Sequence, residues 1–106
     1  DKWKMKLKEE NDRLSKAIIF ATEKHNGQFR KATTTPYIMH PLEVLQILHS
    51  MKADTNLLIA GLLHDTIEDT DTTADEIKEL FGILLEKLRL DQTLQLNGIT
   101  LMEDLK

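Results

Sequence analysis

The sequence predicts an all-α fold, a single helical bundle of about five or six helices that takes up residues 1–106. Only two prolines and four glycines are present, and runs rich in strand-favouring residues are scarce. Apolar residues instead recur at helical spacing in several segments. No linker, internal repeat or low-complexity stretch divides the chain, and its 106 residues suit one domain.

The first predicted helix carries four apolar residues at helical spacing, Leu14, Ala17, Ile18 and Ala21. The lysine- and glutamate-rich residues 1–10 form either a lead-in or the first turns of this helix. Gly27 can end it in the left-handed conformation. A loop is expected over residues 27–41, because Pro36 disfavours helical geometry at the residue before it.

The second helix is predicted to begin near Pro41, since proline is favoured in a first turn. The third is predicted from Leu57 to about Glu68, with Asp54 or Thr55 as its N-cap. Because this third segment is apolar nearly all round, it should lie at the centre of the bundle.

The fourth predicted helix begins in a capping box at residues 73–76, and Gly82 can end it. Beyond Gly82 the periodicity weakens, although residues 83–90 are compatible with a helix and residues 100–106 with a last short one. These two segments account for the helices predicted after the fourth.

The composition argues against several classes of protein. The net charge is -4, which is not the basic balance typical of nucleic-acid binding. No cysteine is present, so disulfides, zinc–thiolate sites and cysteine nucleophiles are excluded. No apolar run approaches the roughly 18 residues of a membrane helix, and no secretory signal is visible. We therefore expect a cytoplasmic protein with neither a nucleic-acid nor a membrane partner.

The densest group of chemically active side chains lies in residues 64–69, directly after an apolar run. Charge in such a place is costly unless it is paired or binds a metal. His64 shares a helix face with Glu68, four residues later. Asp65 shares a face with Asp69 in the same way. A divalent ion held here would supply hydroxide near neutral pH, and a neighbouring carboxylate can orient that water or take its proton.

A metal needs more ligands than one helix end supplies, and His40 is the best further candidate. It lies in the stiff segment that leads into the second helix. Histidine and carboxylate donors without sulfur suit manganese, iron or another first-row ion. The two remaining histidines, His25 and His49, are interpreted as lying outside the site.

Arg30 and Lys31 form a second candidate group, in the loop after the first helix. That loop could fold toward the same cleft, where arginine offers bidentate contact to phosphate and lysine a point charge. Tyr37, later in the loop, either contacts a ligand or covers an edge of the core.

Three stretches carry a resemblance to a known family, namely residues 20–31, 36–42 and 61–70. Over about residues 14–82 the sequence resembles the HD-domain hydrolases of the RelA/SpoT group. Residues 72–82 continue the similarity. Several spaced motifs in one order are much more specific than a lone histidine–aspartate pair.

The resemblance implies an all-helical, manganese-dependent hydrolase that removes the 3′-pyrophosphate from guanosine tetra- or pentaphosphate (ppGpp). The length of the chain resembles that of the small stand-alone members. The implied metal ligands are His40, His64 and Asp65. Glu68 and Asp69 would handle the attacking water. Arg30, with Lys31 beside it, would contact the substrate phosphate or the guanine.

The sequence departs from this family in its C-terminal part. Members of the family carry a further aspartate ligand in a later helix that reads Leu-Ala-Asp-Arg/Lys-Leu, and no such segment occurs here. We interpret the C-terminal part as shortened or divergent, and the remaining metal ligand is not identified. Three alternatives stay open: an HD-type phosphohydrolase with another nucleotide substrate, a catalytically weak module that binds nucleotide and metal, and a purely structural helical bundle.

Overall fold

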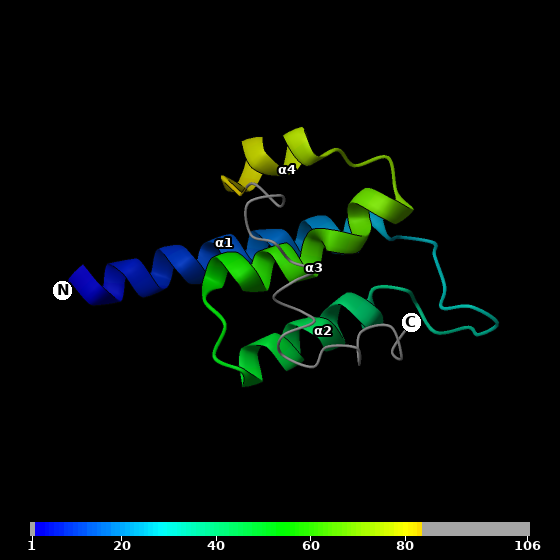
Figure 1. Ribbon diagram of the computed structural model, residues 1–106, viewed down its shortest axis with the longest axis horizontal. Coiled ribbons are helices and arrows are strands. Elements are labelled where there is room, and N and C mark those ends of the chain that lie inside the picture. The colour runs from blue at the N-terminus through cyan, green and yellow to red at the C-terminus, as the bar shows by residue number, and fades with distance from the viewer. Residues whose placement is uncertain (1, 84–106) are drawn as a thin grey trace.

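Four α-helices make up the part of the chain that the computed structural model describes, residues 2–83 (Figure 1). They are α1 (Lys2–Lys24), α2 (Met39–Ser50), α3 (Thr55–Asp69) and α4 (Ala74–Phe81). No β-strand occurs within the described residues, so the predicted all-α fold is confirmed. None of these four helices is long and apolar enough to cross a membrane. Apart from Ile83, the segments predicted as later helices lie outside the described residues.

The central helix of this bundle is α3, which packs against both α1 and α2. Residues 58–63 of α3 are all buried, in agreement with the prediction that this helix should be central. It approaches α2 closely at Gly61, where a Cβ atom would lie 2.3 Å from Leu48 Cδ1. The missing side chain of Gly61 therefore lets the two helices pack closely at this point.

The ends of α3 and α4 are fixed by local capping. The Asp54 carboxylate accepts a hydrogen bond of 2.9 Å from the backbone N–H of Leu57. The Thr73 hydroxyl accepts one of 3.1 Å from the backbone N–H of Glu76. Gly82 then ends α4 with a φ of 68°, in the left-handed region. These contacts confirm the helix boundaries that the sequence predicts here.

The first helix is longer than its apolar stripe requires. It begins at Lys2 and runs for 23 residues, so residues 2–10 are its first turns and not a separate lead-in. These turns project beyond the other helices (Figure 1). Further along α1, the Arg13 guanidinium donates a 2.9 Å hydrogen bond to the carbonyl of Phe81, and the Phe20 and Phe81 rings meet edge to face at 5.5 Å. These contacts attach α4 to α1.

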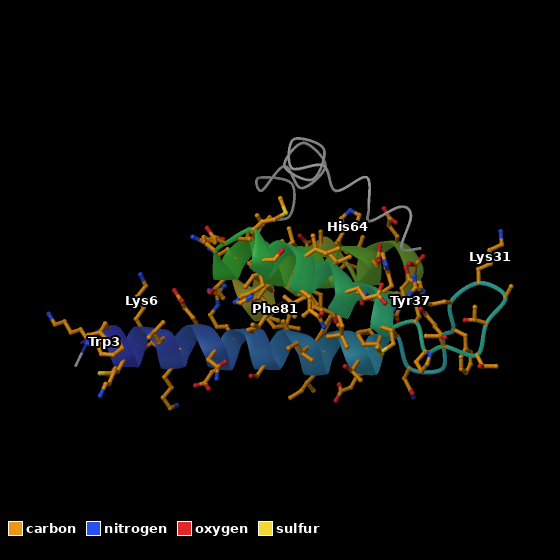
Figure 2. The ribbon with its side chains drawn as sticks, turned by 90° about the horizontal axis from the view of Figure 1, so that it is seen from below. Trp3, Lys6, Lys31, Tyr37, His64 and Phe81 are labelled. Atoms are coloured by element: carbon orange, nitrogen blue, oxygen red, sulfur yellow. The ribbon has the colours of Figure 1, made fainter. Side chains whose placement is uncertain are left out.

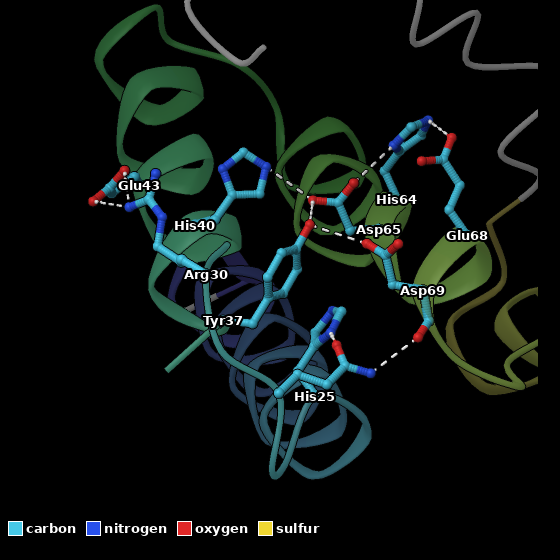
Figure 3. A network of polar contacts seen from close by, with 10 residues as sticks. His25, Arg30, Tyr37, His40, Glu43, His64, Asp65, Glu68 and Asp69 are labelled. Carbon is cyan, nitrogen blue, oxygen red and sulfur yellow. Dashed lines mark hydrogen bonds and ion pairs between the residues drawn. The ribbon is translucent and has the colours of Figure 1, made fainter. Parts of the chain in front are cut away.

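The loop between α1 and α2 doubles back on itself. Phe29 and Pro36 form an isolated antiparallel bridge, and the backbone N–H of Tyr37 donates a 2.8 Å hydrogen bond to the carbonyl of Gln28. Ala32 lies at the turn with a φ of 59°. The reversal returns the chain to the C-terminal end of α3, beside which Tyr37 lies (Figure 3).

The second helix begins at Met39, two residues before the predicted start near Pro41. A tight turn leads into it, because the backbone N–H of Met39 donates to the carbonyl of Pro36 at 3.1 Å. Ile38 already has helical backbone angles, so the turn passes directly into the helix. Pro41 still falls in the first turn, where its missing N–H costs no hydrogen bond.

Candidate metal centre

His40 and Asp65 meet across the packed pair of helices α2 and α3. Nε2 of His40 lies 2.9 Å from Oδ2 of Asp65 (Figure 3). The two residues are 0% and 3% exposed. A carboxylate and an imidazole removed from water in this way are stable only when they are paired or bound to a cation. Their contact shows that the first turn of α2 and the last turns of α3 converge on one point.

His64 and Glu68 extend this contact toward the solvent. Nδ1 of His64 lies 3.6 Å from Oδ1 of Asp65, and Nε2 of His64 lies 4.0 Å from Oε1 of Glu68. One ligand atom from each of these three residues lies within 4.8 Å of the others. His64 and Glu68 occupy the same face of α3 because they are four residues apart.

These side chains fit a divalent cation. Asp65 lies between the imidazoles of His40 and His64, one from each of two helices. The donor set is therefore two nitrogens and a buried carboxylate, with no thiolate available in the chain. Such a set suits manganese, iron or another first-row ion. Among the described residues, the ligand atoms close enough together for one cation belong to His64, Asp65 and Glu68, and His40 contacts Asp65 from the neighbouring helix.

Asp69 is joined to the same group through Tyr37. The Tyr37 hydroxyl donates toward Oδ2 of Asp69 at 3.0 Å and toward Oδ2 of Asp65 at 3.2 Å (Figure 3). Burial, followed by the charges of these two carboxylates, raises the pKa of the Tyr37 phenol far above its ordinary value. The phenol is therefore protonated near neutral pH and acts as a hydrogen-bond donor.

His25 and Gln28 support Tyr37 from the side of α1. The rings of His25 and Tyr37 lie 4.9 Å apart, and His25 is only 2% exposed. Nε2 of Gln28 donates a 2.9 Å hydrogen bond to the carbonyl of Asp69, which orients the amide so that its oxygen faces Nδ1 of His25, also at 2.9 Å. An amide oxygen only accepts, so Nδ1 carries the hydrogen. This support therefore ties α1, the loop and the end of α3 together.

Arg30 lies beside the centre and is already paired. Its guanidinium donates to both carboxylate oxygens of Glu43, at 3.3 and 3.4 Å. Glu43 follows His40 by three residues on α2 and so shares its face of the helix. Lys31, in contrast, is exposed at the tip of the loop and points away from the centre (Figure 2).

The structure thus gathers five of the residues named from the sequence into one network: His40, His64, Asp65, Glu68 and Asp69. Arg30 borders this network, and Lys31 is not part of it. Sequence reasoning gave no role to Gln28 or Glu43, and it placed His25 outside the site. A signal for His25 existed, since it follows the buried Ala21 by four residues and so continues the apolar stripe of α1.

The sequence is similar to a known protein family and to several curated proteins. A family model described as HD domain matches residues 17–102. A protein of Aquifex aeolicus named guanosine-3′,5′-bis(diphosphate) 3′-pyrophosphohydrolase is 52% identical over 77 residues, which are 73% of this chain and 11% of that protein. A protein of the same name from Spiroplasma citri is 45% identical over 75 residues, 71% of this chain and 10% of that one.

Other similar proteins carry a different name, GTP pyrophosphokinase. A GTP pyrophosphokinase of Myxococcus xanthus is 49% identical over 71 residues, which are 67% of this chain and 9% of that protein. The chain therefore spans about a tenth of the length of the curated relatives it matches. The residues of the candidate centre all lie within residues 17–102, which the HD domain model matches.

Proposed function

Because the chain belongs to the HD domain family, we propose that it is a metal-dependent hydrolase that removes the 3′-pyrophosphate from guanosine tetra- or pentaphosphate. The observation that supports this proposal best is that His40 and His64 both contact the buried Asp65, with the carboxylates of Glu68 and Asp69 close by. The names of the Aquifex and Spiroplasma relatives support the choice of substrate.

The metal we propose is Mn²⁺, held by His40, His64 and Asp65. A bound divalent ion lowers the pKa of water and so supplies hydroxide near neutral pH. Asp69, exposed at the end of α3, and Glu68, exposed one residue before it, would orient the attacking water and accept its proton. Burial of His40 and Asp65 keeps bulk water away from the inner side of the site.

The proposed reaction is the hydrolysis of one phosphoester bond. The oxygen of water attacks the phosphorus attached to the ribose 3′-oxygen, and the bond between that phosphorus and the 3′-oxygen breaks. Pyrophosphate leaves with the oxygen of water, and a proton is returned to the 3′-oxygen. Arg30 can bind a phosphate oxygen on the substrate if it exchanges its contact with Glu43 for the new one.

The deciding experiment is an assay of pyrophosphate release from guanosine tetraphosphate with saturating Mn²⁺. We expect release from the tetraphosphate and none from guanosine diphosphate, which carries no 3′-pyrophosphate. A panel of other nucleotides tests whether the substrate differs. No release from any of them, by a folded protein shown to bind Mn²⁺, would exclude hydrolysis.

A second candidate function is a binding module with little turnover. It is favoured by the position of Arg30, which borders the network and can offer a phosphate a bidentate contact. Isothermal titration calorimetry with guanosine tetraphosphate distinguishes the two candidates. Binding that weakens in Arg30→Ala, together with no product release, would identify the module.

A further inference from the structure

The Tyr37 hydroxyl joins two carboxylates that have different tasks in the proposed reaction. It lies 3.2 Å from Oδ2 of Asp65, the proposed metal ligand, and 3.0 Å from Oδ2 of Asp69, which would manage the attacking water (Figure 3). A phenol carries a single hydrogen, so this hydrogen is shared between the two acceptors. The side chain of Tyr37 therefore links Asp65, the proposed metal ligand, to Asp69, the proposed water-handling group.

Tyr37 itself is held firmly enough to fix that spacing. Its backbone N–H bonds to the carbonyl of Gln28 at 2.8 Å, and its ring lies between those of His25 and His40, at 4.9 and 5.7 Å. The amide of Gln28 also bonds to the carbonyl of Asp69 at 2.9 Å. Both the backbone and the carboxylate of Asp69 are thus bound to the same loop.

This support matters because Asp69 is exposed at the last position of α3. An exposed aspartate at a helix end has several side-chain rotamers open to it, and only some of them point toward the metal site. Asp65 is buried, but its orientation decides whether its oxygens face a cation. Hydrogen bonds from outer residues to ligating carboxylates set this orientation and tune metal affinity.

We propose that Tyr37 is a positioning residue, which acts through Asp65 on metal affinity and through Asp69 on turnover. The inference rests on the proposed function, since it assumes a metal held at Asp65. It assigns Tyr37 no contact with the substrate or the ion. His25 and Gln28 support this role of Tyr37, because they hold the Tyr37 ring and the loop against the end of α3.

The test is Tyr37→Phe, which keeps the ring packing and removes only the hydroxyl. We expect Mn²⁺ affinity, measured by isothermal titration calorimetry, to fall about 10- to 100-fold. The kcat for pyrophosphate release should fall at least about 10-fold, with KM within about 2-fold of wild type. Thr22→Val is the matched control, because it removes a hydroxyl whose hydrogen bond, among residues 2–83, stays within α1, to the carbonyl of Ile18.

A second variant shows whether the hydroxyl acts through Asp69. If the hydroxyl acts through Asp69, Tyr37→Phe should lower kcat less in the Asp69→Asn variant than in the wild-type protein. The reason is that the carboxylate that Tyr37 positions is already absent from Asp69→Asn. Full additivity of the two changes would contradict action through Asp69. Circular dichroism establishes that each variant is folded.

Two results would overturn the inference in different ways. If wild type binds Mn²⁺ and Tyr37→Phe binds it equally well with unchanged kcat, Tyr37 has at most a structural role, and the proposed function stands. If wild type itself binds no Mn²⁺ by calorimetry, the metal site fails and the inference falls with it.

Discussion

The Asp65 carboxylate lies 2.9 Å from the imidazole of His40, and each of these residues belongs to a different helix. Neither is accessible to bulk water, so their contact depends on how α2 packs against α3. Residues that set the spacing of these two helices therefore also set the geometry of the metal centre. The centre and the core of the bundle are coupled for this reason.

His40→Ala should abolish measurable Mn²⁺ binding. The loss of an outer-shell partner costs about 10- to 100-fold in affinity, and the loss of a ligand should cost at least as much. His49→Ala is the matched control, because His49 is an exposed histidine on the same helix. Calorimetry measures the affinities, and circular dichroism shows whether the cavity left at residue 40 unfolds the protein. Wild-type affinity in a folded His40→Ala variant would remove His40 from the proposed ligands.

Glu68→Gln should separate turnover from metal binding. If Glu68 handles the water, kcat falls about 10²- to 10⁴-fold, because the amide cannot accept a proton. Mn²⁺ affinity should change by less than about 10-fold, since Glu68 is then not a ligand. Glu79→Gln, at an exposed glutamate on α4, is the control. A loss of affinity as large as in His64→Ala would instead make Glu68 a metal ligand, as its position within 4.8 Å of His64 and Asp65 allows.

Arg30 and Lys31 should differ in their effect on substrate binding. A hydrogen bond to a charged group contributes about 1.5–3 kcal/mol, so Arg30→Ala should raise KM by about 10- to 100-fold. Lys31→Ala should leave KM within about 2-fold, because an exposed charge that points away contributes little. Steady-state kinetics on guanosine tetraphosphate measure both variants. Equal effects of the two substitutions would show that the loop changes position when the substrate binds.

The phenol of Tyr37 should titrate above its usual pKa of 10.0 in the metal-free protein. Tyr37 is the only tyrosine, so the ultraviolet absorbance of phenolate reports this one group. Burial contributes most to the raised pKa, and the carboxylates contribute next. Asp69→Asn should therefore lower this pKa, because one negative charge is removed. Titration of the wild-type phenol at or below pH 10.0 would contradict the half-buried position of the hydroxyl and its two hydrogen bonds to carboxylates.

The raised pKa of the Tyr37 phenol makes the free energy of unfolding depend on pH in the alkaline range. Well below pH 10.0 the phenol is protonated in both the folded and the unfolded chain. Above that pH the unfolded chain loses the proton first, so the free energy of unfolding falls as pH rises. Urea unfolding measured across this range should show a smaller decrease in Tyr37→Phe, which has no phenol. An equal decrease in both proteins would assign the loss to other groups.

The sequence was sufficient to predict features that depend on neighbouring residues alone. Asp54, Thr73 and Gly82 mark helix ends because each satisfies backbone groups one turn away, whatever the rest of the fold does. The grouping of residues 64–69 follows from helical geometry in the same way. The spacing of four residues between His64 and Glu68 places both on one face before any packing is known.

Features that depend on tertiary packing were not predictable. The loop after α1 returns to the end of α3 through the Phe29–Pro36 bridge, and this return decides that Tyr37 reaches Asp69. The same reversal brings Arg30 to Glu43 and leaves Lys31 at the tip. Two adjacent basic residues in a sequence carry no information about which of them faces a site.

Gly61→Ala tests the coupling between helix packing and the metal centre. In an exposed helix this change would stabilise the protein by roughly 1 kcal/mol. Here the new Cβ would lie 2.3 Å from Leu48 Cδ1 and 3.6 Å from Val44 Cγ1, inside the core. Overpacking of this kind costs about 1–3 kcal/mol, so the free energy of unfolding should fall and the melting temperature with it.

The effect should extend to Mn²⁺ binding, because Gly61 precedes Asp65 by one helical turn and faces the helix that carries His40. Pushing α2 away from α3 would lengthen the His40–Asp65 contact and weaken binding. Leu48→Val shortens the side chain that the new methyl group would strike, so the double variant should recover most of the loss in stability and in affinity. Stabilisation by Gly61→Ala in the wild-type background would show that Leu48 moves aside without cost and that the two helices keep their spacing.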